Sequence, residues 1–195
     1  MIRLGSTSPV RAAILKEHGI DFMQSGCNFD EEQITTKNPK SFVYAAAMGK
    51  YQACYKEHGD DLPLLIADTV VTSQGLLLRK AKDREDAKKI LLTQSGNTTS
   101  ILTCTIFKTK ELQIIDLSAT DYLFEKFDEA DLESYLDSNE WQGKAGACMV
   151  EGFCKKYIKS VHGTQNCAMG LSIEKILPYI RVLQEVYLKT LKLSL

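Results

Sequence analysis

Leu4-Gly5-Ser6-Thr7-Ser8-Pro9-Val10-Arg11 is the stretch of sequence from which the expected fold follows. The three residues before its loop, at positions 2–4, form a short apolar run typical of a buried strand. The residues after it, at positions 12–20, continue as an amphipathic helix that Ser8 or Thr7 can cap. The stretch therefore predicts a strand, a tight hydroxyl-rich loop and the N-terminus of a helix.

A loop of this kind can bind an anion. Free backbone N–H groups and the positive end of the helix dipole point toward the same place. Arg11, one turn into the helix, adds a guanidinium group suited to phosphate. The alternative is an ordinary capped first helix of an α/β domain, because caps of this composition are common.

Composition excludes several classes of protein. A chain of 195 residues with 44% hydrophobic content can form one large domain or two small lobes. A net charge of -1 argues against a general nucleic-acid binder, and no apolar run approaches the length of a membrane span. The six cysteines form no CxxC pair and have no histidine at zinc spacing, so we expect reduced, partly buried thiols in a cytoplasmic protein. These cysteines are Cys27, Cys54, Cys104, Cys148, Cys154 and Cys167.

Hydrophobic periodicity predicts an α/β fold along the rest of the chain. Strands are expected at residues 22–29, at 62–67 with continuation beyond Asp68, and at 76–78, 98–108, 112–124 and 157–161. Helices are expected at residues 39–58, 83–94 and 128–138, and from residue 171 onward with a break or kink at Pro178.

Asp68 is the main catalytic candidate from the order of residues alone. It follows a short apolar run that suits a strand buried on both faces, and α/β sheets place ligand chemistry at the ends of such strands. The alternative, an aspartate that forms a turn, is less favoured because the β-branched residues 69–72 continue the strand.

Other charged groups allow two interpretations each. The cluster Asp30-Glu31-Glu32 fits a solvated turn or half of a magnesium site. Lys50 lies beside a stripe of small residues on the helix 39–58, where it reaches either solvent or a cleft. The basic cluster at 79–82 fits an exposed surface or a phosphate clamp, and His162, without a partner carboxylate, is expected to be structural or exposed.

Together these stretches resemble the Maf family of nucleoside triphosphate pyrophosphatases over nearly the whole chain. The opening stretch is similar to the family pattern LASxSPRR, and residues 67–71 match ADTVV. Residues 47–50 match AxxKA except that Tyr51 replaces the final alanine. The remaining similarities are Glu31 after the second strand, Arg79-Lys80-Ala81-Lys82-Asp83 for GKPxD, Gln94-Ser95-Gly96 for LSG, residues 144–152 for KAGAYxxQG, and Gly170-Leu171-Ser172 for GLP.

The resemblance implies a mixed, twisted sheet flanked by helices, as in the Maf and inosine triphosphatase folds. Residues 1–195 would form a single domain with two lobes around one deep cleft, and pair as a homodimer. It also implies hydrolysis of a nucleoside triphosphate to the monophosphate and pyrophosphate with Mg²⁺ or Mn²⁺. A nucleotide-binding regulator of septum formation is the alternative. A nucleotidyltransferase is less favoured because it needs a glycine-rich loop at residues 6–9.

The resemblance also implies roles for individual residues. Asp68 would accept the proton of the attacking water, and Glu31 and Asp68 would hold the metal. Lys50 and Lys80 would neutralise the triphosphate from opposite sides, and residues 6–11 would bind it. The phosphate ligands implied are Ser6, Ser8 and Arg11, with Lys144 and Gly146 elsewhere in the cleft.

The residues that would select the base depart from the family patterns. Val10 replaces the arginine of the dTTP/UTP branch and the tryptophan of the 7-methyl-GTP branch. Thr69 fits the dTTP/UTP branch, whereas Glu151 is closer to the 7-methyl-GTP branch. Base selectivity therefore does not carry over, and the loss of a charge at Val10 and of a proline at Ala81 alters the phosphate site.

Overall fold

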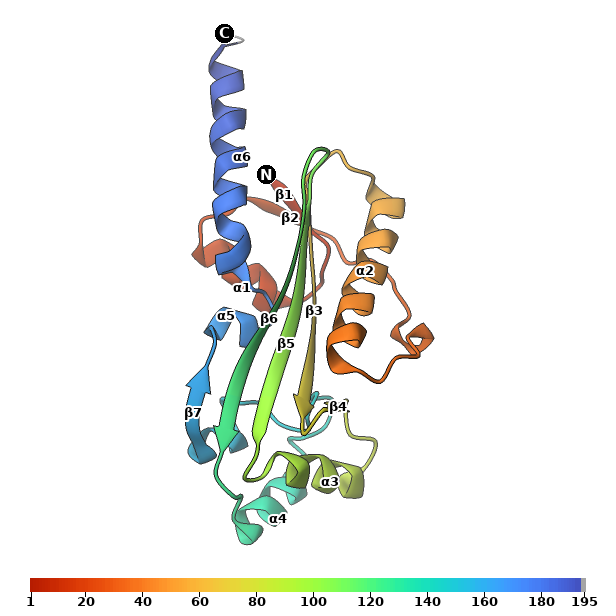
Figure 1. Ribbon diagram of the computed structural model, residues 1–195, viewed down its shortest axis with the longest axis vertical. Coiled ribbons are helices and arrows are strands. Elements are labelled where there is room, and N and C mark those ends of the chain that lie inside the picture. The colour runs from red at the N-terminus through yellow and green to blue at the C-terminus, as the bar shows by residue number, and fades with distance from the viewer. Residues whose placement is uncertain (194–195) are drawn as a thin grey trace.

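The computed structural model describes the backbone of residues 1–193 and the side chains of residues 1–185, and Figure 1 shows it as an open sheet with helices on both faces. The sheet has seven strands in the order β2-β1-β3-β5-β6-β7, with β4 paired to β3. Its strands are β1 (Ile2–Leu4), β2 (Phe22–Gln24), β3 (Leu64–Ser73), β4 (Leu76–Leu78), β5 (Thr98–Lys108), β6 (Gln113–Phe124) and β7 (Ile158–His162).

The sheet is mixed, as the sequence predicts. β1 pairs in parallel with both β2 and β3, whereas β3, β5, β6 and β7 form an antiparallel series. The ten-residue β3 is the one strand that belongs to both halves. Asp68 lies in the middle of β3, opposite Cys104 of β5, and does not end the strand.

Helices cover the two faces and one end of the sheet (Figure 1). One face carries α2, and the other carries α1, α5 and α6, while α3 and α4 lie at the end near β4. In residues 1–193, no helix is long and apolar enough to cross a membrane. The helices are α1 (Pro9–Glu17), α2 (Pro39–His58), α3 (Arg84–Gln94), α4 (Glu129–Asp137), α5 (Gln165–Ala168) and α6 (Ile173–Leu193), with short 3₁₀ turns η1 (Glu31–Gln33) and η2 (Phe153–Tyr157).

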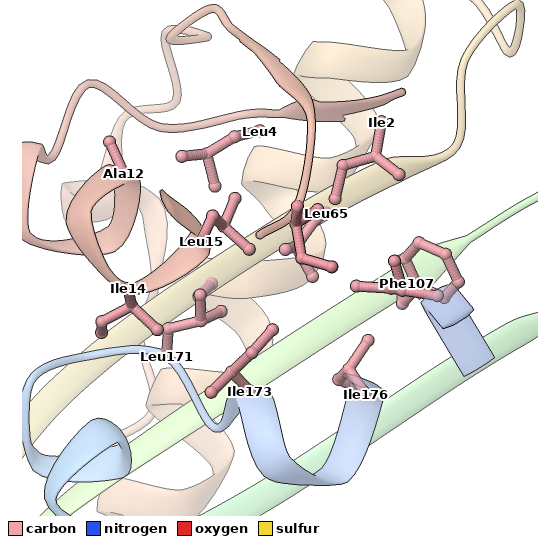
Figure 2. Packing of buried hydrophobic residues seen from close by; sticks show 13 residues of the cluster. Ile2, Leu4, Ala12, Ile14, Leu15, Leu65, Phe107, Leu171, Ile173 and Ile176 are labelled. Carbon is pink, nitrogen blue, oxygen red and sulfur yellow. The ribbon is translucent and has the colours of Figure 1, made fainter. Parts of the chain in front are cut away.

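Two buried clusters hold these layers together. Alternate residues of a strand point to opposite faces, so Leu65 packs with α1 and α6 whereas Ile66 packs with α2. Figure 2 shows the first cluster, in which Leu15 of α1, Phe107 of β5 and Ile173 of α6 close around β1 and β3. The opening strand and helix are therefore anchored to the C-terminal helix through the core.

Two predicted elements are wrong in extent. The second strand covers only Phe22–Gln24, because the chain leaves the sheet at residues 25–30 and passes beside the opening loop, where a Cβ on Gly26 would lie 2.4 Å from the Thr7 side chain. Of the break or kink predicted at Pro178, the break does not occur, since α6 continues through this residue. The φ angle of proline is compatible with a helix. Burial of the apolar face of α6 in the first cluster compensates for the hydrogen bond that proline cannot donate.

The expectation of six reduced thiols is also wrong. Cys27 forms a disulfide with Cys54, and Cys148 forms one with Cys154, whereas Cys104 and Cys167 are buried free thiols. The first disulfide joins the segment after β2 to α2. Such a pairing depends on how the two segments pack, which cysteine spacing alone does not reveal.

We expect Leu65→Ala to lower the free energy of unfolding by about 2–5 kcal/mol, because it removes a fully buried side chain at the centre of the first cluster. Leu92→Ala, on the exposed side of α3, is the matched control and should change it by less than about 0.5 kcal/mol. Urea unfolding of both variants measures the difference, and equal midpoints would contradict this account of the core.

Candidate active site

The opening loop forms the wall of a polar cavity. Its volume is about 390 Å³, and its lining combines residues 5–8 and Arg11 with residues 26–28 and Lys50. Ser8 caps α1 by accepting a hydrogen bond from the Arg11 backbone N–H, at 3.4 Å. The Ser6 hydroxyl in turn accepts from the Ser8 backbone N–H at 3.2 Å. Caps and loop together present polar groups to a cavity of the size of a phosphate chain.

Arg11 is held in place by three different segments. Its guanidinium donates to the Ser6 hydroxyl at 3.1 Å, to the Thr69 hydroxyl at 3.3 Å and to the Gly170 carbonyl at 2.7 Å. Burial lowers the pKa of Arg11, and the negative charges of Asp68 and Glu31 oppose that shift. An arginine has five N–H donors, so two remain for an anion in the cavity.

Lys50, Glu31 and Asp68 form a compact charged cluster beside this cavity. The ammonium group of Lys50 pairs with Glu31 at 2.7 Å and also with a carboxylate oxygen of Asp68. The Asp68 side chain is only 6% exposed, and its second oxygen, Oδ2, is buried without a hydrogen-bond partner among the described residues. The cluster thus joins η1, α2 and β3, three elements that are far apart in the sequence.

The pKa values of this cluster reflect burial and pairing together. Burial raises the pKa of Asp68, and the charge and hydrogen bond of Lys50 only partly oppose this. Burial by itself would lower the pKa of Lys50, but its two carboxylate partners outweigh that effect and raise it. Asp68 therefore has the raised pKa that suits a group exchanging protons.

A second, mostly apolar cavity adjoins the first. Its volume is about 450 Å³, and the three predicted specificity residues, Val10, Thr69 and Glu151, all line it. Val10 and Arg11 are neighbours in α1 that line different cavities, and Arg11 donates to the Thr69 hydroxyl. Arg11 therefore links the lining of the apolar cavity to that of the polar one.

The sequence does not single out Thr103 and Gln94, which support this surface. The fully buried Thr103 lies 3.0 Å from Thr69, hydroxyl to hydroxyl, and donates to the Cys167 carbonyl at 2.7 Å. In the sequence it is one β-branched residue among several in a strand. Gln94 is recognisable only as a polar residue where the LSG pattern has leucine.

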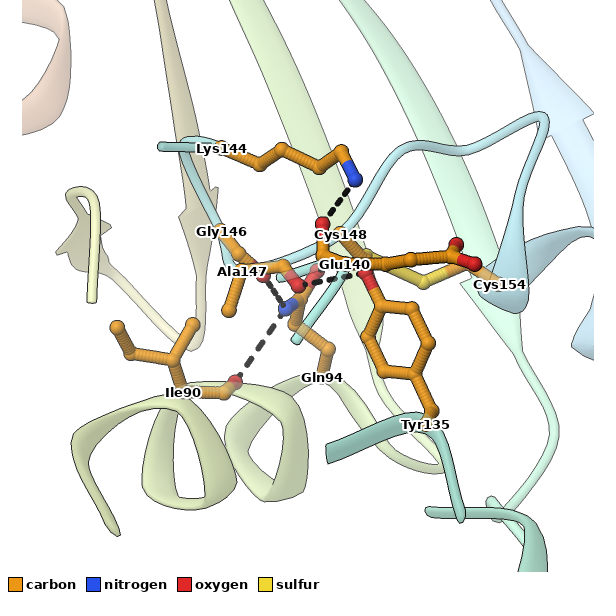
Figure 3. The surroundings of a disulfide bond; sticks show 9 residues. All are labelled: Ile90, Gln94, Tyr135, Glu140, Lys144, Gly146, Ala147, Cys148 and Cys154. Atoms are coloured by element: carbon orange, nitrogen blue, oxygen red, sulfur yellow. Dashed lines mark hydrogen bonds between the residues drawn. A yellow bond between two sulfur atoms is a disulfide. The ribbon is translucent and has the colours of Figure 1, made fainter. Parts of the chain in front are cut away.

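Gln94 holds the loop at residues 144–148 in place (Figure 3). Its amide, buried at 1% exposure, donates to the Gly146 carbonyl at 2.7 Å, and the Tyr135 hydroxyl donates to the Ala147 carbonyl at 3.1 Å. Gly146 has a φ of 71°, and its Cβ position would lie 3.0 Å from Val71, so glycine is favoured there. Lys144 donates to the Glu140 carbonyl of the same loop.

Lys80 is the predicted site residue that the structure does not join to the charged cluster. Its backbone forms a bridge with Ala145, while its side chain is exposed and has no hydrogen bond or ion pair within the described residues. Its neighbour Arg79 instead pairs with Glu32 at 2.9 Å. The ion pair of Arg79 with Glu32, and not Lys80, therefore brings the basic cluster at residues 79–82 close to the acidic cluster at residues 30–32. His162 is exposed, as predicted.

The sequence relatives agree with this architecture. The family model described as "Maf-like protein" matches residues 1–183 of this chain. The chain belongs to the Maf family. A relative from a Nitratiruptor species is 54% identical over 90% of this chain and 96% of its own length, and its name is nucleoside triphosphate pyrophosphatase. Proteins of that name from Helicobacter pylori (strain Shi470) and Campylobacter jejuni (strain 81-176) are 37% and 33% identical, each over 92% of this chain and over 94% and 100% of their own lengths.

The Maf motifs lie around the two cavities. The opening stretch and Lys50 line the polar cavity, Glu31 and Asp68 pair with Lys50, and Thr69 and Glu151 line the apolar cavity. Gly170 of the last motif accepts from Arg11. Motifs spread over most of this Maf chain therefore converge on one region.

Replacing Lys50 by methionine is expected to raise the pKa of Asp68 further. The substitution removes the charge and hydrogen bond of Lys50 that lower this pKa and leaves only the charge of Arg11 to oppose the effect of burial. The Asp68 carboxyl carbon resonance, followed by NMR against pH, measures the change. Lys89→Met, at an exposed lysine of α3, is the control. An unchanged or lower Asp68 pKa in Lys50→Met would contradict the pairing.

Gln94→Met should lower the free energy of unfolding by about 1–3 kcal/mol, since the Gly146 carbonyl loses its donor while the side-chain volume is kept. Gln52→Met, at an exposed position of α2, should be nearly neutral. Urea unfolding compares the two variants, and a neutral Gln94→Met would show that Gln94 does not hold the loop.

Proposed function

We propose that this Maf protein hydrolyses a nucleoside triphosphate to the nucleoside monophosphate and pyrophosphate. The observation that carries the proposal is the Lys50–Asp68–Glu31 cluster, with its unpaired carboxylate oxygen, beside the loop 5–8 and Arg11. The names of the three relatives support the same activity. The apolar cavity and the polar cavity then correspond to the base and the triphosphate, in a cleft between two lobes of one domain.

In this proposal a water molecule attacks the α-phosphorus. A bond forms from the water oxygen to that phosphorus, and the bond from the phosphorus to the oxygen bridging the α- and β-phosphates breaks. Pyrophosphate leaves with the electron pair of that bond, and Asp68 accepts the proton of the water. A raised pKa makes the Asp68 carboxylate a stronger base, which favours this transfer.

The remaining polar residues would bind and orient the phosphates. Ser6 and Ser8 lie at the N-terminus of α1, and two free N–H groups of Arg11 complete that wall. Lys50 would neutralise charge near the reacting phosphate. Lys80 and Lys144, in segments joined by the bridge of Lys80 with Ala145, would add positive charge around the bound triphosphate.

The two carboxylates fit a divalent cation. Asp68 Oδ2 is a buried oxygen without a partner among the described residues, and Glu31, 36% exposed, supplies a second oxygen donor across Lys50. Mg²⁺ and Mn²⁺ prefer oxygen ligands of this kind, with water and phosphate completing the shell. Glu31 and Asp68 would hold such an ion, which would neutralise charge on the phosphates when bound.

The apolar cavity would receive the base. Val10 and Thr69 line it, and Glu151 provides a carboxylate at an exposed position. An aromatic ring fits the apolar walls, and a carboxylate accepts hydrogen bonds from ring N–H groups. Val10, Thr69 and Glu151 are therefore the residues at which we propose that the base is selected.

A regulator that binds nucleotides without turnover, with a role in septum formation, is the second candidate. It would need the two cavities but not a buried carboxylate with a raised pKa. The Asp68 environment favours the hydrolase. Burying a carboxylate costs free energy, and buried groups with a shifted pKa occur most often where they take part in catalysis.

We expect Asp68→Asn to lower kcat by about 10²–10³-fold with Mg²⁺ present, since the amide cannot accept the proton of the water. Pyrophosphate release across natural and modified nucleoside triphosphates, with Mg²⁺ or Mn²⁺ and with a chelator, measures the activity. Asp61→Asn, at an exposed turn, is the matched control and should keep full activity.

Two results would overturn the proposal. Near-normal turnover of Asp68→Asn would exclude Asp68 as proton acceptor. Tight nucleotide binding by the unsubstituted chain without pyrophosphate release from any of the triphosphates would support the regulator.

A further inference from the structure

A group of side chains of the types that bind metals lies at the edge of the polar cavity and plays no part in the proposed hydrolysis. The ligand atoms of Cys27, Glu57 and His58 all lie within 4.8 Å of one another. Cys54 joins them as the disulfide partner of Cys27. Spacing along the sequence does not reveal this group, because Cys27 comes from a segment far from Glu57 and His58.

The last turn of α2 carries Glu57 and His58 of this group and also Cys54, which is linked to the group through its disulfide with Cys27. Cys54, Glu57 and His58 stand at positions i, i+3 and i+4, which share one face of a helix. Cys27 approaches that face from the segment after β2. Two cysteines, a histidine and a carboxylate make a donor set typical of Zn²⁺.

The surroundings of His58 point to a missing partner. Its Nε2 atom is buried and has no hydrogen bond within the described part of the chain, and the nearest acidic atom is Glu57 Oε1 at 3.6 Å. An unpaired polar atom in a buried position is costly. Coordination of a cation shared with Glu57 and the cysteine sulfurs would satisfy it.

The backbone already allows this geometry. The Cα atoms of Cys27 and Cys54 are 5.2 Å apart. In a tetrahedral site with Zn–S bonds of about 2.3 Å, two thiolates are separated by about 3.8 Å, which side-chain rotation can provide once the sulfur–sulfur bond is broken. Glu57 is 58% exposed and gives an ion a path from solvent.

We propose that Cys27, Cys54, His58 and Glu57 bind Zn²⁺ when the Cys27–Cys54 disulfide is reduced. A dithiol supplies two electrons and two protons: the sulfur–sulfur bond breaks, two thiols form, and the dithiol becomes a cyclic disulfide. Zn²⁺ then displaces one proton from each thiol and binds the two thiolates, the neutral imidazole and the carboxylate.

The position of this site ties it to the charged cluster. Cys27 precedes Glu31 by four residues, and Cys54 follows Lys50 by one helical turn. The Cys54 sulfur lies 2.7 Å from the place of a Cβ on Gly5, directly under the opening loop, and Cys27 lines the polar cavity. A disulfide or a zinc ion at this place therefore anchors the segments that carry Glu31 and Lys50.

The test uses the full chain and Zn²⁺ alone, without nucleotide. Reduced protein, freed of excess dithiol, is titrated against a chromogenic zinc chelator, and Co²⁺ is used as a spectroscopic probe. We expect one Zn²⁺ per chain, thiolate-to-cobalt charge-transfer absorption, and a higher melting temperature with Zn²⁺. The oxidised protein should show none of these.

Two variants separate a built site from scattered thiols. Cys27→Ser should abolish the charge-transfer absorption. His58→Gln, at the accessible end of α2, should weaken Zn²⁺ binding at least about tenfold, because loss of even an outer-shell partner of a metal ligand costs about 10–100-fold. Cys148→Ser and His162→Gln are the matched controls and should bind as the unsubstituted chain does.

Zn²⁺ binding unaffected by Cys27→Ser or by His58→Gln, or equal in oxidised and reduced protein, would overturn the proposal. The readouts do not depend on nucleotide hydrolysis, so they stand apart from any failure of the proposed activity.

Discussion

The ion pairs of Lys50 with Asp68 and Glu31 are the constraint on which the rest of the site depends. A carboxylate in the middle of a buried strand is costly to ionise, and here a lysine from the neighbouring helix makes it tolerable. The lysine can reach it because small residues of α2 let that helix pack closely against β3. The close packing of α2 on β3 therefore makes the pairing of Lys50 with the buried Asp68 possible, and this pair lies beside the polar cavity.

Charge also distinguishes the two cavities. Arg11 and Lys50 place positive charge around the loop 5–8, whereas beyond Thr69 the walls are apolar. Arg11 sits at the boundary and is fixed by hydrogen bonds to Ser6, Thr69 and Gly170, so the boundary is rigid. A ligand with one apolar ring and one charged chain, as a nucleotide has, fits this arrangement.

Covalent and polar links hold the loops that complete the site. The Cys27–Cys54 disulfide connects the segment leading to Glu31 with the helix that carries Lys50. On the other side, Gln94 and Tyr135 hold the loop 144–148, whose last residue Cys148 is joined to Cys154 (Figure 3). Both links act on loops that the sheet itself does not position. Their effect is to keep side chains of distant segments in fixed relation without a larger core.

The sequence by itself determined the opening strand–loop–helix, the long strands, α2 and the candidate carboxylate Asp68, because capping, periodicity and a buried apolar run are local properties. Only the tertiary structure decided that Lys50 turns to Asp68, that Arg79 rather than Lys80 meets the acidic cluster, and that Cys27 reaches Cys54 and His58. The tertiary structure also decided that the second strand ends at Gln24. These outcomes depend on which distant segments pack together, and one-dimensional spacing carries no information about that.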